Sequence, residues 1–276
     1  MGDYLRPTRL DEALQALTRS RTVLAGGTDF YPARVGRAID EDVLDITAIA
    51  ALRGISANVD GWRLGATTTW SELLDAALPP LFDGLKQAAR EVGGRQIQNA
   101  GTLAGNLCNA SPAADGVPPL LALDAEVELV SGAGARRLPL AAFITGNRRT
   151  ALGPGELLVA IHVRKRSRDA RSAFLKLGAR RYLVISIAMA AAVLEADHGR
   201  IAAASIAVGA CSAVAQRLPL LEQALVGAPI DQRLGNLVEE AQLEPLTPID
   251  DVRGSAAYRR DAVVTLLRRL LVGMVP

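Results

Sequence analysis

The sequence predicts a folded chain of mixed helices and strands, divided into two or three compact units. With 276 residues and a mass of 29.0 kDa, it is long enough to bury a sizeable core. Half of its residues are hydrophobic and 22% are charged, which is the balance of a folded protein. Segments whose apolar residues have helical spacing are interspersed with short apolar runs typical of buried strands.

The amino-terminal part predicts one helix and three strands. Thr8 and Asp11 resemble a capping box, and the apolar residues that follow repeat with helical spacing. A short buried strand then runs into a turn at 22–27. Further strands are expected at 42–47 and 62–66.

The central part predicts three helices and a strand around one long irregular segment. Thr69 and Glu72 form a second capping box, and Ser111 followed by Pro112 is a favoured order at a helix start. The stretch from Gly93 to Ser111 is too long for an ordinary connection, so we expect it to have a functional reason. The expected elements are helices at 70–78, 81–92 and 113–123 and a strand at 126–130.

The carboxyl-terminal part predicts antiparallel strands followed by two or three helices. The turn at 197–200 joins two long apolar runs into a hairpin. The last helix is expected at 256–272, with an apolar stripe of Tyr258, Val263, Val264, Leu267, Leu270 and Leu271. The expected strands are 157–163, 172–177, 184–196 and 200–212.

Composition argues against several classes of function. The formal net charge of +2 provides no large basic field for nucleic acid or anionic lipid. Cys108 and Cys211 lie far apart and cannot by themselves hold zinc or an iron–sulfur cluster, so no metal site is expected. The apolar run from Val184 is too short to span a bilayer, and the first residues lack the apolar core of a signal peptide. We therefore expect a cytoplasmic protein.

The stretch "LAGGTDF" has two interpretations. Gly26 and Gly27 allow the backbone to approach a ligand, so that consecutive N–H groups converge on an anion without a lysine. Thr28 adds a hydroxyl donor, and Asp29 can accept local N–H bonds. A plain β-turn explains the same residues.

A second stretch gathers small residues that form hydrogen bonds. Gly101, Thr102, Gly105 and Asn106 can wrap a polar ligand. Asp115, expected on the first turn of the next helix, is placed to accept two ribose hydroxyls, as acidic residues do in other dinucleotide sites. The alternative is a capping network around an ordinary long loop.

Four segments carry a resemblance to a known family. They are "TVLAGGTDF", "GATTTWSELL", "RQIQNAGTLAGNLCNASPAADGVPPLLALDAEVEL" and "AFLKLGARR". In this order and at this spacing they resemble the FAD-binding medium subunits of the molybdenum hydroxylases, the group of xanthine dehydrogenase, carbon monoxide dehydrogenase and hydroxybenzoyl-CoA reductase. The resemblance covers essentially the whole chain, and "TLAGNLCNASPAAD" is its most specific motif.

The resemblance implies an α+β fold without a Rossmann sheet. An FAD-binding domain of the vanillyl-alcohol-oxidase/PCMH type is expected over residues 1–167, with subdomains of about 1–55 and 56–167 that enclose an extended FAD. A CO dehydrogenase flavoprotein-like C-terminal domain, an antiparallel sheet with helices, is expected over 168–276.

The resemblance also implies a set of FAD contacts. Asp115 would contact the nucleotide sugar, and Lys176 would lie near the pyrimidine end of the flavin, where a cation favours the anionic reduced form. Arg180 to Tyr182 begin a loop over the ring, in which Val184 replaces the usual aspartate. The remaining contacts would be Val23, Leu24, Ala25, Gly26, Gly27, Thr28, Asp29 and Phe30 in a first loop, Thr102, Leu103, Ala104, Gly105 and Asn106 in a second, and Thr67, Val92 and Leu158.

The function implied by the resemblance is electron transfer within a larger oxidoreductase. Noncovalent FAD would take electrons from [2Fe–2S] clusters of a small subunit, after substrate oxidation at a molybdenum cofactor in a large subunit. The acceptor would be NAD, a quinone, a cytochrome or oxygen, and the assembly a dimer of heterotrimers. No catalytic residue is expected in this chain, and it does not reveal whether the substrate is a purine, an N-heteroaromatic, an aldehyde or carbon monoxide.

Two other functions remain to be weighed. A stand-alone FAD-dependent oxidoreductase of the same superfamily would need an acid or base over the flavin, and no His, Cys or Glu stands at a motif position. A non-catalytic assembly subunit with a decayed flavin site is disfavoured by the intact glycines of both loops.

Overall fold

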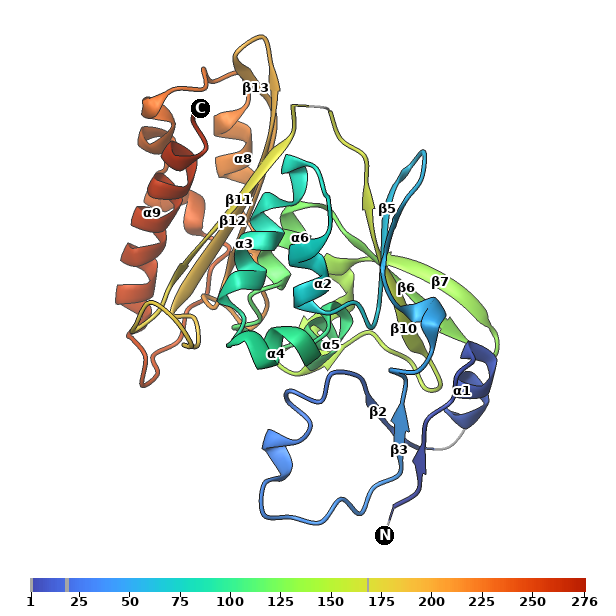
Figure 1. Ribbon diagram of the computed structural model, residues 1–276. Coiled ribbons are helices and arrows are strands. Elements are labelled where there is room, and N and C mark those ends of the chain that lie inside the picture. The colour runs from blue at the N-terminus through green and yellow to red at the C-terminus, as the bar shows by residue number, and fades with distance from the viewer. Residues whose placement is uncertain (1, 18–19, 168) are drawn as a thin grey trace.

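The computed structural model describes residues 2–17, 20–167 and 169–276, and in these ranges the chain forms four sheets and several short helices (Figure 1). The expected domain boundary between residues 167 and 168 falls at one of the gaps, so residue 168 itself lies outside the described residues. None of the described helices is both long and apolar enough to cross a membrane.

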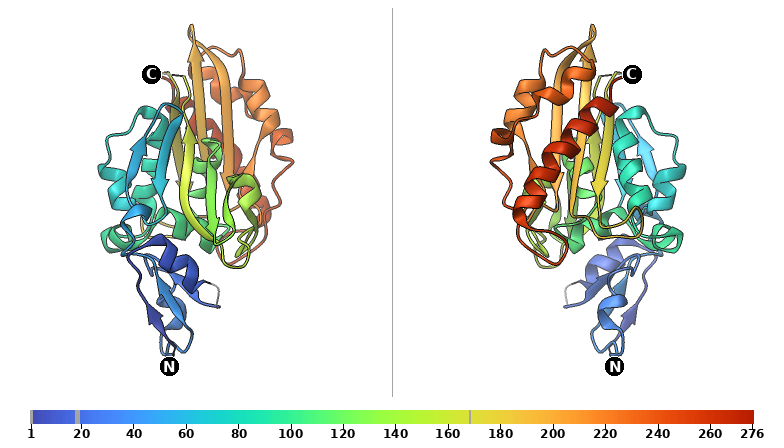
Figure 2. Two further views of the ribbon diagram at one scale, coloured as in Figure 1. Left: turned by 90° about the vertical axis from the view of Figure 1, so that its right-hand side faces the viewer. Right: turned by 90° about the vertical axis from the view of Figure 1, so that its left-hand side faces the viewer.

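A small amino-terminal layer lies at one end of the molecule (Figure 2). Its parallel sheet has the order β1 (Tyr4–Leu5), β3 (Val43–Asp45) and β2 (Thr22–Leu24), next to α1 (Leu10–Ala16). Between β2 and β3 the chain makes the glycine turn and a 3-10 turn, η1 (Pro32–Arg34). The glycine turn therefore directly follows a short strand, as the sequence predicts.

The first helix begins without the predicted capping box. Its N-cap residue is Arg9, which has extended backbone and no side-chain capping bond. The Asp11 carboxylate instead accepts two hydrogen bonds from the Arg9 guanidinium, at 2.7 and 3.0 Å. The prediction that Thr8 and Asp11 form a capping box is wrong, because the Asp11 carboxylate binds the Arg9 guanidinium instead.

A five-stranded antiparallel sheet forms the body of the first half (Figure 1). Its strands run in the order β4 (Ile55–Ala57), β5 (Gly61–Gly65), β10 (Leu157–Arg164), β6 (Glu126–Ser131) and β7 (Gly134–Pro139). Each neighbouring pair is antiparallel, so this sheet is unlike the parallel sheet of a Rossmann fold.

Short helices pack against one face of this sheet around a continuous core. Trp70, Phe82, Leu103 and Leu107 are almost completely buried there. The helices are α2 (Trp70–Asp75), α3 (Asp83–Glu91), α4 (Arg95–Ala100), α5 (Leu103–Asn109), α6 (Val117–Ala122) and α7 (Leu140–Phe143), with 3-10 turns η2 (Ala50–Leu52) and η3 (Pro80–Phe82) and the hairpin β8 (Ile144–Gly146) and β9 (Arg149–Thr150).

Capping side chains decide where two of these helices begin. The Thr69–Glu72 capping box is confirmed: Thr69 Oγ1 accepts the Glu72 N–H at 3.2 Å, and Glu72 Oε2 accepts the Thr69 N–H at 2.8 Å. Thr102 caps α5 in the same way, accepting the Gly105 N–H at 3.1 Å. The segment from Gly93 to Ser111, expected to be irregular, is therefore largely helical: it contains α4 and α5, which meet at Gly101.

The helix expected from residue 113 begins later, at Val117. Pro118 and Pro119 occupy the first turn, where a missing N–H costs little. Ser111 Oγ accepts the Ala113 N–H and forms a tight turn instead of a helix start. Asp115 therefore precedes the helix, in contrast to its predicted place on the first turn.

The second half is an antiparallel sheet covered on both faces. Its strands are β11 (Arg171–Leu177), β12 (Ala188–Asp197), β13 (Arg200–Gly209) and β14 (Gln216–Arg217), and the predicted hairpin is confirmed between β12 and β13. Alternate residues of β12 enter two different cores. One face packs on α3 and α6, and the other on the carboxyl-terminal helices.

The covering helices are α8 (Pro219–Leu225) and α9 (Ala256–Gly273), with η4 (Gln232–Leu237) and η5 (Glu240–Leu243) between them (Figure 2). The predicted stripe of α9 is mostly correct, since Val263, Leu267, Leu270 and Leu271 are buried. Tyr258 is 48% exposed, so its assignment to the stripe is wrong, and Arg259 is buried instead.

Candidate functional site

A cavity of about 830 Å³ lies where the amino-terminal layer, the helices α4 and α5, and the β11–β12 loop meet. This volume is in the range of cofactor sites. Its wall includes the glycine turn after β2, the start of α5, the segment 111–115 and the loop 183–185. Segments distant in sequence thus contribute to one cavity.

The first glycine turn fits its place because it lacks side chains. A Cβ on Gly26 would lie 2.0 Å from the carbonyl oxygen of Ala100 and 2.8 Å from the Cα of Gly101. Gly27 has a φ of +70°, and a Cβ there would lie 2.6 Å from the Tyr31 ring. The turn after β2 therefore lies directly against the junction of α4 and α5.

Backbone N–H groups at this turn are available to a ligand. Among the described residues, no acceptor is found for the N–H groups of Gly26, Gly27 and Thr28. The carboxylate of Asp29 does not brace the turn as expected; instead its backbone carbonyl accepts the Ala33 N–H at 3.2 Å. The turn thus presents donors to the cavity without a nearby lysine side chain in its own sequence.

The second turn supplies further polar groups. Gly105 lies in close contact with the capping side chain of α5, since a Cβ there would be 2.7 Å from Thr102 Oγ1. Asn106 Oδ1 is buried and has no hydrogen-bond partner among the described residues, although Asn106 lines the cavity. An unpaired buried amide oxygen is costly and indicates a site that a polar ligand completes.

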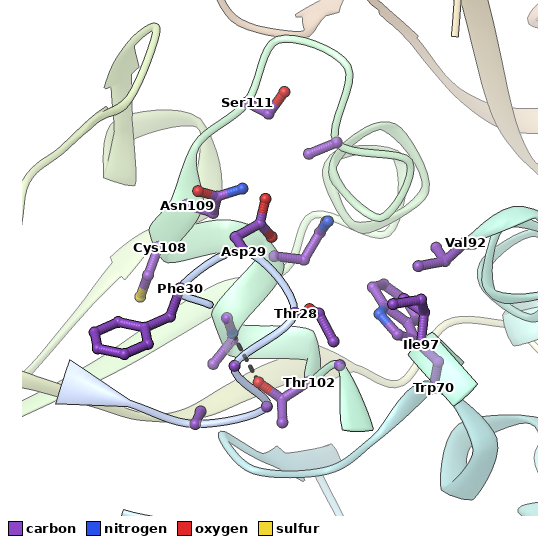
Figure 3. A pocket seen from close by; sticks show the side chains of 18 of the residues that line it. Thr28, Asp29, Phe30, Trp70, Val92, Ile97, Thr102, Cys108, Asn109 and Ser111 are labelled. Carbon is purple, nitrogen blue, oxygen red and sulfur yellow. Dashed lines mark hydrogen bonds between the residues drawn. The ribbon is translucent and has the colours of Figure 1, made fainter. Parts of the chain in front are cut away.

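The cavity has different walls on its two sides (Figure 3). Phe30 and Cys108 lie together on one side, and Trp70, Ile97 and Val92 gather on the other. Thr28 lies between the two groups in this view, and its Oγ1 would be 3.4 Å from a Cβ on Gly101. The polar turns therefore occupy the middle of the cavity, with apolar surface at both sides. Cys108 is an exposed residue that lines this space.

An ion pair lies at the wall of the cavity. Lys176 Nζ lies 2.7 Å from Asp115 Oδ2, and Ser186 Oγ donates to Asp115 Oδ1 at 2.6 Å. Burial raises the pKa of the Asp115 carboxyl, while the charge and hydrogen bond of Lys176 and the Ser186 hydroxyl oppose this rise. Both carboxylate oxygens are thus held by side chains from the second half of the chain.

A short apolar loop borders the cavity beside this pair. Leu183 and Ile185 are more than half exposed, and both line the cavity together with Val184. A Cβ on Gly178 would lie 2.3 Å from Val184 Cγ1, so the glycine allows the loop to fold back on itself. The side chain that replaces the usual aspartate is therefore packed within the loop.

Most of the predicted contact residues line this cavity. Thr67, Leu103 and Lys176 do not: the Thr67 hydroxyl donates to the Leu52 carbonyl, Leu103 is buried in the core, and Lys176 donates to Asp115. The predicted residues that do line it are Val23, Leu24, Ala25, Gly26, Gly27, Thr28, Asp29, Phe30, Val92, Thr102, Ala104, Gly105, Asn106, Asp115 and Leu158.

Sequence reasoning missed several residues of the site. Trp70 and Ile97 line the cavity from helices, and Arg148 lines it from the β8–β9 turn. Arg148 has a φ of +57°, unusual for a non-glycine residue, which the sequence does not reveal. Ser186 could have been found from the sequence, because it is a single hydroxyl within an apolar run.

Comparison with known proteins identifies the kind of site. A family model described as the FAD binding domain in molybdopterin dehydrogenase matches residues 1–164, and one described as the CO dehydrogenase flavoprotein C-terminal domain matches residues 173–274. The chain belongs to this family of FAD-binding subunits. The family inferred from the sequence motifs is thereby confirmed, and so is FAD as the cofactor.

Relatives of this flavin subunit match it over nearly its whole length. The xanthine dehydrogenase FAD-binding subunit of Escherichia coli O157:H7 is 30% identical over 277 residues, which cover 98% of this chain and 94% of the relative. The carbon monoxide dehydrogenase medium chain of Afipia carboxidovorans is 32% identical over 281 residues, which cover 97% and 94%. These relatives are subunits of oxidoreductases, and this chain is an oxidoreductase subunit of the same family.

Solved structures agree with the fold of this flavin subunit. It matches quinoline 2-oxidoreductase from Pseudomonas putida 86 with a TM-score of 0.90 and 26% identity, covering 100% of this chain and 97% of that one. It matches CO dehydrogenase from Oligotropha carboxidovorans with a TM-score of 0.89 and 29% identity, covering 98% and 96%. The predicted α+β class, an FAD-binding domain followed by a second α+β domain, is confirmed.

Proposed function

We propose that this chain is the electron-transfer subunit of a molybdenum-containing hydroxylase. The observation that carries the proposal is the contact between two glycine turns, at Gly26 and Gly101, beside N–H groups for which the described residues provide no acceptor. Such a place can hold a stable diphosphate through amide dipoles and the Thr28 hydroxyl. Because no phosphate is transferred, a lysine to neutralise developing charge is unnecessary.

Several features of the cavity support FAD as its occupant. The two turns would hold the diphosphate, and the unpaired Asn106 oxygen would accept a hydrogen bond from the cofactor. Bound FAD supplies the ability to accept single electrons and to donate them in pairs. The residues of the chain orient the cofactor, and the apolar sides of the cavity exclude water from it.

The Asp115–Lys176 pair refines two of the predicted contacts. The sequence assigned Asp115 to the nucleotide sugar and Lys176 to the flavin ring, yet the two side chains are 2.7 Å apart. We infer that they act together on one part of the cofactor. Lys176 would act through Asp115, since it does not line the cavity itself.

The partners and the electron route follow from the family. We propose that electrons enter from [2Fe–2S] clusters of a small subunit, that a large subunit holds the molybdenum cofactor, and that the complex is a dimer of heterotrimers. The acceptor would be NAD, a quinone, a cytochrome or oxygen. The division near residue 167 and the cytoplasmic location stay predictions.

Flavin binding by the purified chain tests the core of this proposal. After incubation with FAD and removal of free cofactor, we expect about one FAD per chain, released intact by acid precipitation because it is bound noncovalently. A protein that remains colourless would overturn the proposal. Covalently retained flavin would contradict the mode of binding.

Co-expression tests the proposed partners. We expect this chain to co-purify with a molybdopterin-binding subunit and with a small protein carrying two cysteine clusters, both encoded beside it. Substrate should then reduce the flavin in the complex. Oxidation of a substrate by this chain alone would instead favour the stand-alone oxidoreductase.

A further inference from the structure

Arg259, near the start of α9, is a buried cation outside the cavity. Its side chain is only 3% exposed, and its Nη2 lies 2.6 Å from Asp251 Oδ1. Its Nη1 donates to the carbonyl oxygens of Ile187 and Ala210, the latter at 3.0 Å. A desolvated guanidinium is stable only when it is paired in this way.

The two carbonyls belong to residues beside the ends of neighbouring strands. Ile187 precedes β12 and Ala210 follows β13, so the two lie at the same end of the sheet. The start of α9 lies at this end as well, because Arg259 reaches both carbonyls. One planar side chain therefore ties two strand ends to a helix.

Both strand ends in turn hold the segment that carries Asp115. Ser186, next to Ile187, donates its hydroxyl to Asp115 Oδ1 at 2.6 Å. The N–H of Ala210 donates to the carbonyl of Pro112 at 3.0 Å. The segment 112–115 is thus held at both ends. Ala210, which holds one end, also accepts a hydrogen bond from Arg259, and Ser186, which holds the other, is next to the second acceptor, Ile187.

Lys176, the other member of the ion pair, is also linked to the backbone at Ile187. The Ile187 N–H donates to the carbonyl of Leu177 at 2.8 Å, and Leu177 follows Lys176 on β11. Lys176 is paired with Asp115 at 2.7 Å. The positions of both members of the pair therefore depend on the backbone at Ile187.

We propose that Arg259 is a positioning residue of the cofactor site. By holding the carbonyls of Ile187 and Ala210, it sets the segment 112–115 and the Asp115–Lys176 pair at the cavity wall, without contacting the cofactor. This inference rests on the proposed function for its effect on FAD. It also makes α9, in the second half of the chain, part of the support of the site.

The planar fork of arginine suits this task. Its donors point in fixed directions and reach two carbonyls and one carboxylate at once, whereas a lysine ammonium is a compact charge on a flexible stem. We therefore expect Arg259→Lys to keep the buried charge and to rescue the positioning only partly.

The main test compares Arg259→Gln with Arg268→Gln. Arg268 lies on the same helix and donates to the carbonyl of Val238 at 3.0 Å, away from the cavity. For Arg259→Gln we expect FAD affinity to fall about tenfold, the equivalent of one lost charge-assisted hydrogen bond, together with a changed absorption spectrum of bound flavin. Arg268→Gln should retain both the affinity and the spectrum.

Amide hydrogen exchange of the FAD-free protein provides a readout that does not depend on flavin. In Arg259→Gln, peptides covering 111–117 and 186–188 should exchange faster than in the wild type, and in Arg268→Gln they should not. If the wild type binds no FAD, the proposed function fails while this measurement still decides the positioning role.

Further variants cover the case in which Arg259→Gln does not fold. Ser186→Ala removes one link of the same chain and should weaken FAD binding and loosen 112–115, and Arg259→Lys should lie between the wild type and Arg259→Gln. A folded Arg259 variant with wild-type FAD affinity and unchanged exchange at 111–117 would overturn the inference. Unchanged FAD affinity and exchange in Ser186→Ala would do the same.

Discussion

At the scale of single residues, the site depends on places where a side chain cannot fit. Gly26 lies so close to the Ala100 carbonyl that a Cβ would be 2.0 Å from it. Gly27 combines a φ of +70° with a close approach to Tyr31. Gly26 allows the first turn to contact the α4–α5 junction, Gly27 allows its left-handed bend beside Tyr31, and the sequence marked both of them.

Replacing Gly27 tests the left-handed bend of this turn and its contact with Tyr31. Gly27→Val should abolish measurable FAD binding, because the branched side chain both strains the left-handed backbone and displaces the Tyr31 ring. The matched control is Gly36→Val: Gly36 has a φ of +76°, but nothing lies within 4 Å of a Cβ there. Titration with FAD should show binding by the control, and equal loss in both variants would contradict the role of the contact.

A second residue-scale prediction concerns Asp45 at the end of β3. Burial by itself raises the pKa of this carboxyl, but hydrogen bonds from Thr47 and Tyr4 outweigh it, so the pKa lies below its ordinary value of 3.8. The stabilisation is therefore complete above pH 3.8 and is lost as the pH falls through the folded-state pKa.

The variant Asp45→Asn should lower the free energy of unfolding at pH 7 by about 1–3 kcal/mol, because buried donors lose a charged acceptor. The gap between wild type and variant should narrow as the pH is lowered below 3.8. Urea unfolding at pH 7 and pH 3 measures it. A gap that stays constant would show that ionisation of Asp45 is not the cause.

At the scale of elements, two threonine caps allow the contribution of capping to protein stability to be distinguished from a contribution to FAD binding. Thr69 caps α2 and Thr102 caps α5, each by accepting an N–H three residues on. Of the two, Thr102 lines the cavity. Thr69 therefore acts as a helix cap away from the cavity, whereas Thr102 is both a helix cap and a residue of the cavity wall.

We predict that Thr69→Ala and Thr102→Ala each lower the free energy of unfolding by about 1 kcal/mol. Thr102→Ala should also weaken FAD binding, whereas Thr69→Ala should not, and Thr102→Ser should recover both properties. Urea unfolding and FAD titration of the three variants measure this. Equal FAD affinity in the two alanine variants would show that Thr102 acts as a cap alone.

The elements also show where sequence patterns mislead. The stretch 93–110 is rich in glycine and asparagine and predicts a loop, yet its two short helices are stabilised by caps and by Leu103 and Leu107 in the core. Helical propensity is weak there, and tertiary burial overrides it. Conversely, Thr8 matches a capping pattern, but the neighbouring Arg9 takes its partner Asp11.

At the scale of the whole molecule, the site joins both halves of the chain. Asp115 comes from the first half, whereas Lys176 and Ser186, which hold it, come from the second. The hydrophobic core is shared in the same way, because Phe174, Met189 and Val193 pack with α2, α3 and α6. FAD should therefore stabilise the protein as one unit.

We predict that FAD at a hundredfold excess over its dissociation constant raises the free energy of unfolding by about 2.7 kcal/mol. The two halves should unfold in a single transition, with tryptophan fluorescence and circular dichroism giving the same midpoint. The Gly27→Val variant, without FAD binding, should gain no stability. Separate transitions, with only the first half shifted by FAD, would contradict a site supported by both halves.

The sequence by itself determined the family, the fold class and two of the segments that line the cavity, the glycine turn at 23–30 and the start of α5. The family and the fold class followed from the resemblance of the motifs, and Gly26 and Gly27 could be recognised because a close backbone approach or a left-handed turn requires glycine, which a linear pattern records. Tertiary structure alone decided that Asp115 and Lys176 form one pair, that Ser186 completes it and that Arg259 supports it. These contacts join residues 61 to 72 positions apart, and their partners are selected by the packing of two domains, which no local pattern contains.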